Sequence, residues 1–345
     1  MVLRFKLVRI SVIHGDGIGP KIVNATLRIL EEVSDLYNLN LEFIDTPAGD
    51  NALREFGEAL PKFSLEKIIN SDACLKGPVG ETARDVIVYL RQYLDLYANI
   101  RPFKTFRGIK SFWKNIDLVI VRENTEDLYR GVEDLGPDHA VALLVITKKR
   151  TERIAKIAFD LALRRRKKVT IIHKGNVLKS YLYFRDVAVE VGRRYNNVDV
   201  EDMYVDNAAY QLIVNPERFD ILLTPNMFGD ILSDEAAGLI GSIGLTCSAN
   251  ISEEYGLFEP IHGSAPDIDP EYANPLGQVL TGSMMLEWLS YKKEKREYMD
   301  ASREIREAVE KILEDADTLT PDLGGKAKTD NLVHKIIEYI RRKFI

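Results

Sequence analysis

Two aspartates lie four residues apart in a segment that is predicted to be helical. Asp230 and Asp234 belong to the run 229–235, and residues at positions i and i+4 share one face of an α-helix. A third acid, Asp206, follows a predicted strand, where a turn could bring it to the same point. Three oxygen ligands are typical of a hard cation such as Mg²⁺ or Mn²⁺. From the spacing alone, a solvated acidic helix face is the commoner meaning of such a pair.

Three arginines could bind the carboxylates of a small acidic substrate beside that cation. Arg91 falls on a predicted helix, Arg101 on a loop and Arg122 at a strand end. Because a guanidinium group can donate two parallel hydrogen bonds to a carboxylate, the set predicts a di- or tricarboxylate substrate. Ordinary surface ion pairs are the alternative for any single one of them.

Alternating strands and helices would position these residues, which predicts an α/β fold with a largely parallel sheet. The glycines at 15, 17 and 19 lie between the first strand and the first helix, but they lack the Rossmann spacing. A hairpin over residues 130–147, with its turn at 136–138, could form an arm that holds a partner chain. Predicted strands cover residues 7–13, 41–46, 73–76, 118–122, 140–147, 169–173, 198–205 and 221–224; predicted helices cover 22–36, 152–165, 181–195, 278–293 and 303–315.

Composition limits the classes of function. The 345 residues are 46% hydrophobic and carry a net charge of -6, which argues for a globular protein without a nucleic-acid or membrane-surface partner. The longest apolar run, 140–146, is far shorter than the roughly 20 residues of a membrane-spanning helix. No signal peptide is evident, so we expect a cytoplasmic protein.

Six blocks of sequence occur in the order of a known family: 15–20, 95–102, 122–126, 173–176, 226–234 and 259–268. In these blocks the chain resembles the β-decarboxylating dehydrogenases that act on isocitrate, homoisocitrate and 3-isopropylmalate, nearest the archaeal-type homoisocitrate and isocitrate branch. The resemblance implies a two-domain isopropylmalate-dehydrogenase-like fold with a large mixed sheet flanked by helices, not a Rossmann fold. Residues 1–100 and 251–345 would form a large cofactor-binding domain, and 101–250 a small domain with the dimerisation arm and metal ligands.

The same resemblance implies roles for individual residues. Asp206, Asp230 and Asp234 would bind the Mg²⁺ or Mn²⁺ ion, with Asp206 supplied by a partner subunit. Lys174, also from the partner, would accept the hydroxyl proton, and Tyr129 would donate a proton to the enolate carbon after decarboxylation. The active form would be a homodimer or a tetramer of dimers.

The cofactor expected from the resemblance is NAD. An aspartate at position 267 would accept hydrogen bonds from the adenosine ribose, and its charge would repel the 2′-phosphate of NADP. The other expected cofactor contacts are Ile268, Asn274, Asn176 and Gly263.

The distal group of the substrate would meet the helix that precedes Arg91. Arg84 could reach a distal carboxylate, whereas Val88 would suit an alkyl group. We therefore expect NAD-dependent oxidative decarboxylation of a (2R,3S)-2-hydroxy acid, with homoisocitrate or isocitrate preferred and 3-isopropylmalate as the alternative. The alternatives from other classes of protein are a Mg²⁺-dependent transferase or hydrolase and a non-catalytic regulatory subunit.

Overall fold

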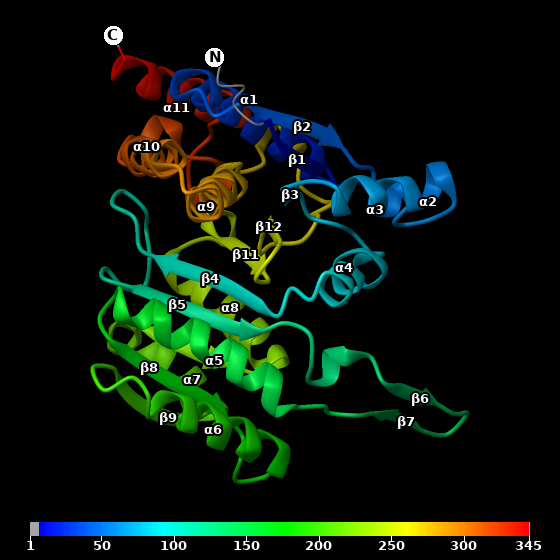
Figure 1. Cartoon of the computed structure of the whole chain (residues 1–345). Helices are drawn as coiled ribbons and strands as arrows, with labels where there is room; N and C mark the ends of the chain where they lie inside the picture. The colour runs from blue at the N-terminus through cyan, green and yellow to red at the C-terminus, as the bar shows by residue number, and fades with distance from the viewer. Residues whose placement is uncertain (1–6, 345) are drawn as a thin grey trace, which may run out of the picture.

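The computed structural model describes residues 7–344 and contains one large mixed sheet (Figure 1). In chain order the strands are β1 (Val8–Ile13), β2 (Leu41–Asp45), β3 (Ala73–Lys76), β4 (Ala98–Lys104), β5 (Asp117–Glu123), β6 (Glu133–Leu135), β7 (Ala140–Ala142), β8 (Lys168–His173), β9 (Asp199–Tyr204), β10 (Ile221–Thr224), β11 (Cys247–Ile251) and β12 (Gly256–Pro260). Ten of them form a sheet in the order β2-β1-β3-β12-β11-β4-β5-β10-β8-β9. The expected α/β fold with a large mixed sheet is confirmed.

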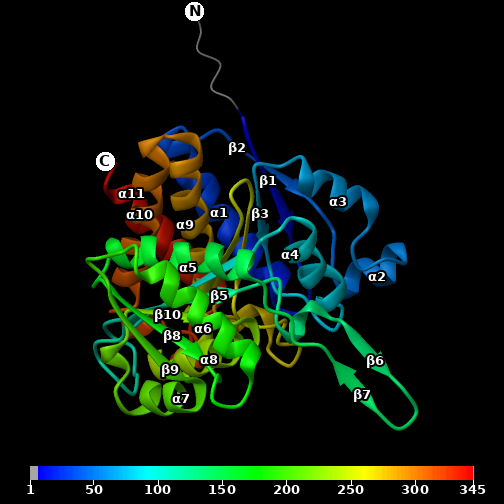
Figure 2. The ribbon, with the colours of Figure 1, turned by 60° about the horizontal axis from the view of Figure 1, so that its bottom comes forward.

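Helices cover both ends of this sheet. They are α1 (Gly19–Tyr37), α2 (Asp50–Phe56), α3 (Lys62–Ile69), α4 (Tyr89–Tyr93), α5 (Lys148–Leu163), α6 (Lys179–Gly192), α7 (Val205–Val214), α8 (Asn226–Ile240), α9 (Leu276–Lys293), α10 (Arg296–Ile312) and α11 (Thr329–Arg342). Helices α1, α9, α10 and α11 pack together at the β1 end, while α5 to α8 lie at the β9 end (Figures 1 and 2). No helix in the described part of the chain is both long and apolar enough to cross a membrane.

The two ends of the sheet meet through antiparallel strands. β4 pairs antiparallel with both β5 and β11, and β11 pairs antiparallel with β12, whereas the remaining pairs of the large sheet are parallel. The expected domain boundaries, after residues 100 and 250, fall within β4 and β11. The division into two domains stays a prediction.

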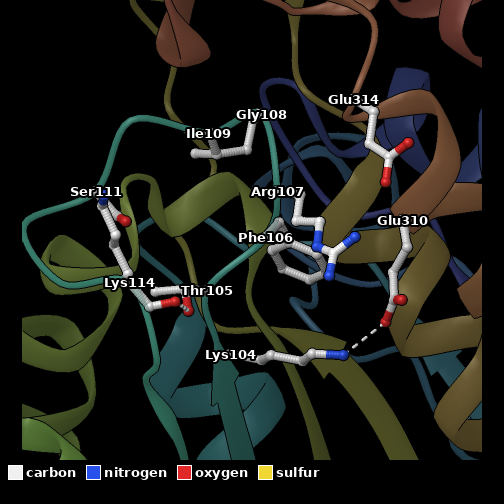
Figure 3. Close-up of a pocket in the computed structure, with 10 residues that line it drawn as sticks. All are labelled: Lys104, Thr105, Phe106, Arg107, Gly108, Ile109, Ser111, Lys114, Glu310 and Glu314. Carbon is white, nitrogen blue, oxygen red and sulfur yellow. Dashed lines mark hydrogen bonds and ion pairs between the residues drawn. The ribbon is translucent and has the colours of Figure 1, made fainter.

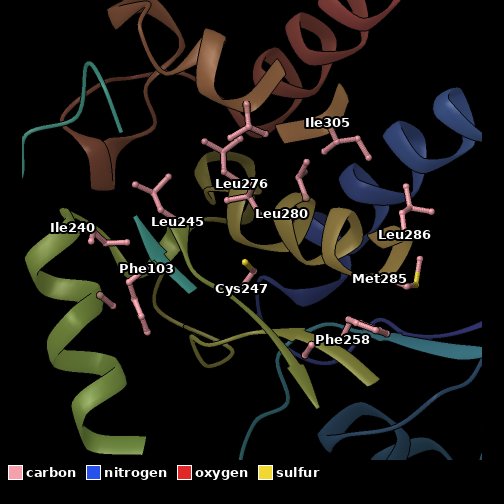
Figure 4. Packing of buried hydrophobic residues seen from close by; sticks show 14 of the residues in the cluster. Phe103, Ile240, Leu245, Cys247, Phe258, Leu276, Leu280, Met285, Leu286 and Ile305 are labelled. Carbon is pink, nitrogen blue, oxygen red and sulfur yellow. The ribbon is translucent and has the colours of Figure 1, made fainter. Parts of the chain in front are cut away.

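Alternating residues of β5 supply two separate hydrophobic cores. Leu118 and Ile120 belong to the cluster that includes residues of α8, and Val119 and Val121 to the cluster that includes residues of α5. This alternation is the ordinary geometry of a strand covered on both faces. Figure 4 shows the first cluster between the sheet and α9, where Cys247 and Phe258 face the helix.

Several boundaries differ from the sequence predictions. β7 ends at Ala142 rather than at residue 147, although the predicted hairpin itself is present as β6 and β7. Arg101 was expected on a loop and lies inside β4 instead. Pro102 made a strand at this position hard to predict, because proline cannot donate a backbone hydrogen bond. It lies beyond the residues of β4 that pair with β11, so no hydrogen bond between these two strands is lost.

Candidate active site

Helix α8 carries the two aspartates on which the metal prediction rests. Asp230 and Asp234 lie one turn apart in this helix, which follows β10 directly, so the predicted helical spacing is confirmed. The side chain of Asp230 is 38% exposed. Burial raises the pKa of the Asp234 carboxyl, and the neighbouring charge of Asp230 adds to the rise.

Two buried arginines and a tyrosine hold the carboxylate of Asp230. Nη1 of Arg122 lies 2.5 Å and Nη1 of Arg101 lies 3.3 Å from Oδ1 of Asp230, and the Tyr129 hydroxyl donates to Oδ2 at 3.0 Å. Burial alone would favour the protonated carboxyl, but the charges of Arg122 and Arg101 outweigh burial and hold the pKa of Asp230 below its ordinary value. The carboxylate is therefore ionised at neutral pH.

The pairing of β4 with β5 places the two arginines on one face of the sheet. Arg122 pairs with Asn99, and Arg101 lies two residues beyond Asn99 on the same strand. Because alternate residues of a strand point to the same side, both guanidinium groups face α8. Gly229 permits this packing, since a Cβ added there would lie 2.7 Å from Cγ of Arg122. Strands rather than loops thus fix the position of both arginines.

Arg91 joins a buried ion cluster that the sequence did not predict. Its Nη2 donates to Oε1 of Glu259 at 3.0 Å, and Nζ of Lys76 donates to Oε2 of the same carboxylate at 2.7 Å. Burial opposes ionisation of Glu259, yet the charges of Lys76 and Arg91 hold its pKa well below the ordinary value. One signal was available in the sequence: Lys76 ends an otherwise apolar strand, where a charged residue requires a partner.

Lys174 and Asp206 form a separate, more exposed pair. Nζ of Lys174 lies 2.7 Å from Oδ1 of Asp206, and the Asp206 side chain is 67% exposed. Asp206 lies in the first turn of α7, directly after β9, as its position behind a strand had indicated. Among residues 7–344, no group of three His, Cys, Asp or Glu side chains gathers at one point. The chain therefore does not bring Asp206 to Asp230 and Asp234 by itself.

The segment before Arg91 begins with a π-helical turn, η1 (Arg84–Val88), which continues into α4. The Arg84 guanidinium lies 3.3 Å from the carboxylate of Glu133 on β6, and both side chains are exposed. Val88 is half-buried. Val88 and Arg91 are three residues apart, a spacing that places side chains on neighbouring positions of a helical face.

The glycine turn after β1 packs against the loop after β12. The backbone N–H of Ile18 donates to the carbonyl of Ser264 at 2.9 Å. Gly17 has φ +56°, and a Cβ there would lie 2.0 Å from that carbonyl oxygen, so only glycine fits. Nε2 of His262 is buried and has no hydrogen-bond partner in the described part of the chain.

The predicted cofactor residues fall into three places. Gly263, Asp267 and Ile268 are exposed together on the loop after β12. Asn274 is buried, and its side chain accepts from the Leu276 N–H and donates to Asp322. Asn176 is exposed near Lys174.

A cavity of about 590 Å³ lies elsewhere, between the β4–β5 loop and the end of α10 (Figure 3). Lys104 and Glu310 form an ion pair of 2.8 Å across it. None of the predicted site residues lines this cavity.

Comparison with known proteins places the chain among dehydrogenases. Residues 9–336 match the model of the isocitrate/isopropylmalate dehydrogenase family. The chain is 47% identical to the 3-isopropylmalate dehydrogenase of Sulfurisphaera tokodaii, over 95% of this chain and 97% of that one. It is 42% identical to the homoisocitrate dehydrogenase of Methanocaldococcus jannaschii, over 98% and 99% of the two chains. The isocitrate dehydrogenase of Methylococcus capsulatus has a similar structure, with a TM-score of 0.91, 41% identity and coverage of 97% and 100%.

Fold and similarity together define an oxidoreductase that acts on small carboxylate substrates. The chain belongs to the isocitrate/isopropylmalate dehydrogenase family and is a β-decarboxylating dehydrogenase.

Proposed function

We propose that this protein catalyses the oxidative decarboxylation of 3-isopropylmalate, with NAD as hydride acceptor and Mg²⁺ or Mn²⁺ as the bound cation. The observation that carries the proposal is the convergence of Arg101, Arg122 and Tyr129 on Asp230 in a chain of this family. The relative named for 3-isopropylmalate is more similar than the one named for homoisocitrate. The substrates that the sequence favoured, homoisocitrate and isocitrate, therefore become the alternative.

The surroundings of the distal substrate group support an alkyl substituent. Arg84, the residue expected to bind a distal carboxylate, already has Glu133 as its partner. Val88 presents an apolar side chain on the same helical stretch as Arg91. An isopropyl group against Val88 would lose no hydrogen bond, whereas a carboxylate there would be desolvated without a partner.

The oxygen ligands present fit a hard divalent cation. Asp230 and Asp234 share one helix face, and an exposed Asp206 from a second copy would complete the set. When bound, the cation would polarise the substrate carbonyl and hold the negative charge that remains as carbon dioxide leaves.

Tyr129 and Lys174 would move the protons. Burial and the charge of Asp230 raise the pKa of the Tyr129 hydroxyl, so this group keeps its proton at neutral pH and is suited to donate it. Lys174 would take the proton of the substrate hydroxyl. Arg91, Arg101 and Arg122 would meanwhile hold the substrate carboxylates.

The loop after β12 fits a dinucleotide. The buried Nε2 of His262 is left for a ligand atom. Apart from Gly263 and its two chain neighbours, no residue in the described part of the chain has an atom within 4 Å of a Cβ added at Gly263. The exposed Asp267 would accept hydrogen bonds from the ribose hydroxyls of NAD, beside Ile268. NAD would take the hydride from the substrate. Since the side chain of Asn274 is already bonded within the protein, its backbone is the part left for adenine.

A shared active site requires a homodimer or a tetramer of dimers. In one chain Asp206 is exposed and Lys174 is half-buried, and large apolar side chains are exposed on nearby elements. Leu135 on the hairpin is 79% exposed, and Ile231, next to Asp230 on α8, is 60% exposed. Exposed apolar side chains of this kind are typical of surfaces that another chain covers.

The substrate proposal is tested by comparing kcat/KM for 3-isopropylmalate, homoisocitrate and isocitrate with NAD and Mg²⁺. We expect 3-isopropylmalate to be preferred by at least about tenfold. Arg84→Ala should leave its kcat/KM within about twofold, because Arg84 would not touch the substrate. A preference for homoisocitrate that Arg84→Ala removes would instead favour the alternative.

The cofactor proposal predicts the effect of reversing the charge at position 267. In the double variant Asp267→Lys and Ile268→Tyr, the preference for NAD over NADP should fall by at least about tenfold, because a cation would replace the anion that repels the 2′-phosphate. Steady-state kinetics with both cofactors measure this ratio. Asp269→Lys, which makes the same charge change two residues away, is the control. An unchanged ratio in the double variant would show that residue 267 does not face the ribose.

A further inference from the structure

The three arginines expected to bind substrate share one feature that the family resemblance did not point to. Nε of Arg91 donates to Oδ1 of Asn250 at 3.1 Å, and Nε of Arg101 donates to Oδ1 of Asn99 at 2.7 Å. Both asparagines are completely buried. In each case an amide oxygen accepts the hydrogen bond of the Nε–H group and so fixes the orientation of the guanidinium group. The remaining N–H groups of the arginine can then bind a ligand.

Arg122 repeats the arrangement with a third asparagine. Its Nε and Nη2 donate to Oδ1 of Asn226 at 3.0 and 2.7 Å. The amide nitrogen of Asn226 donates in turn to the backbone carbonyl of Glu126 at 3.2 Å. Asn226 is 1% exposed, so the amide is fixed from both sides.

Two of the three asparagines, Asn99 and Asn250, are also linked to each other, which fixes the orientation of their amides. Nδ2 of Asn99 donates to Oδ1 of Asn250 at 2.6 Å, and Nδ2 of Asn250 donates to Glu259 at 2.9 Å and to the Leu257 carbonyl at 3.2 Å. The amide oxygens must therefore face the arginines, because the amide nitrogens have their own acceptors.

The choice of a neutral acceptor has an electrostatic consequence. Aspartate would accept the same hydrogen bonds from a guanidinium group, but it would also cancel the positive charge. The Arg122 side chain is 1% exposed, and an arginine keeps its positive charge at neutral pH even when it is buried. An asparagine partner thus keeps a buried cation oriented without supplying a second anion next to Asp230.

We propose that Asn99, Asn226 and Asn250 are positioning residues that orient the three arginines without adding to the negative charge of Glu259 and Asp230. Part of the positive charge of the arginines and Lys76 is then left for the substrate. The charge that remains selects ligands with two or more carboxylates. This inference rests on the proposed function, because it takes the arginines to be the carboxylate-binding groups of the dehydrogenase.

Asn226→Asp tests the inference, since it keeps the oxygen that faces Arg122 and adds one negative charge. The KM for 3-isopropylmalate should rise by at least about tenfold, the loss of one charge-assisted hydrogen bond. The KM for NAD should stay within about twofold. Tm should fall, because the hydrogen bond from the Asn226 amide to the Glu126 carbonyl is lost, so the comparison of the two KM values carries the test. Asn331→Asp, which adds the same charge on the exposed face of α11, is the control and should change neither constant.

Two results would overturn the inference. One is an unchanged KM for the hydroxy acid in Asn226→Asp, and the other is an equal rise of the KM values for the hydroxy acid and for NAD, which indicates a merely structural role. Failure of the proposed function is recognised separately. If the wild-type protein oxidises none of the three hydroxy acids, the inference can be tested without catalysis. Calorimetry then measures the affinity of the wild type and of Asn226→Asp for 3-isopropylmalate in the absence of NAD. Tighter binding by the wild type than by Asn226→Asp supports it, and equal or absent binding contradicts it.

Discussion

A heterodimer of two inactive variants should regain about half of the wild-type activity, if Lys174 acts in the active site of the partner. Tyr129→Phe and Lys174→Met should each lower kcat by about a hundredfold or more, because each would remove a group that we propose to transfer a proton. In a dimer with one chain of each kind, one site would carry both substitutions and the other would carry neither. Two affinity tags, one on each variant, allow the heterodimer to be purified and assayed.

The alternative gives a different result in the same experiment. If Lys174 served the site of its own chain, each site of the heterodimer would lack one group, and activity would stay as low as in the single variants. Within one chain, Tyr129 contacts Asp230 whereas Lys174 contacts Asp206, which is the arrangement that the proposed shared site requires. A heterodimer of Tyr129→Phe with an Asn331→Asp chain is the matched control, and its activity should not exceed about half of the wild type, whichever chain supplies the lysine.

The sequence predicted the local structure around the proposed metal ligands, which depends on spacing along the chain. Asp230 and Asp234 depend only on the helical period, and Asp206 depends on a strand that ends just before it. Both patterns are local, and α8 and β9 follow them. Arg122 at the end of a buried apolar strand was likewise placed correctly.

The residues that sequence reasoning missed depend on contacts between distant segments. Glu259 meets Lys76 across 183 residues and Arg91 across 168 residues. Asn250 becomes a partner of Arg91 only because β11 lies between β4 and β12. The three strands β4, β11 and β12 were not predicted from the sequence. They contain Asn or Pro, which disfavour a strand assignment. Without the strand order, no pattern in the sequence indicates which buried anion faces which cation.

Glu259→Gln should cause the largest loss of stability of any single substitution considered. The variant would leave Lys76 and Arg91 buried with no counter-ion, and breaking a buried pair costs about 3–5 kcal/mol. Because the folded-state pKa of Glu259 is depressed, its contribution is present above the ordinary carboxyl pKa and is lost as the pH falls through the folded value. The difference in Tm between wild type and variant should therefore be full at pH 7 and should shrink on acidification below about 4.5.

The double variant Lys76→Met with Glu259→Gln separates the charge effect from a packing effect. Removing the cation together with its anion should restore a large part of the lost stability, so the double-mutant cycle should give a coupling energy of at least about 2 kcal/mol. Arg91 keeps Asn250 as a partner in both variants. Additive losses would contradict the electrostatic explanation, since two independent packing defects would sum. Recovery of Tm without recovery of the KM for the hydroxy acid would show that Glu259 also orients Arg91 for the substrate.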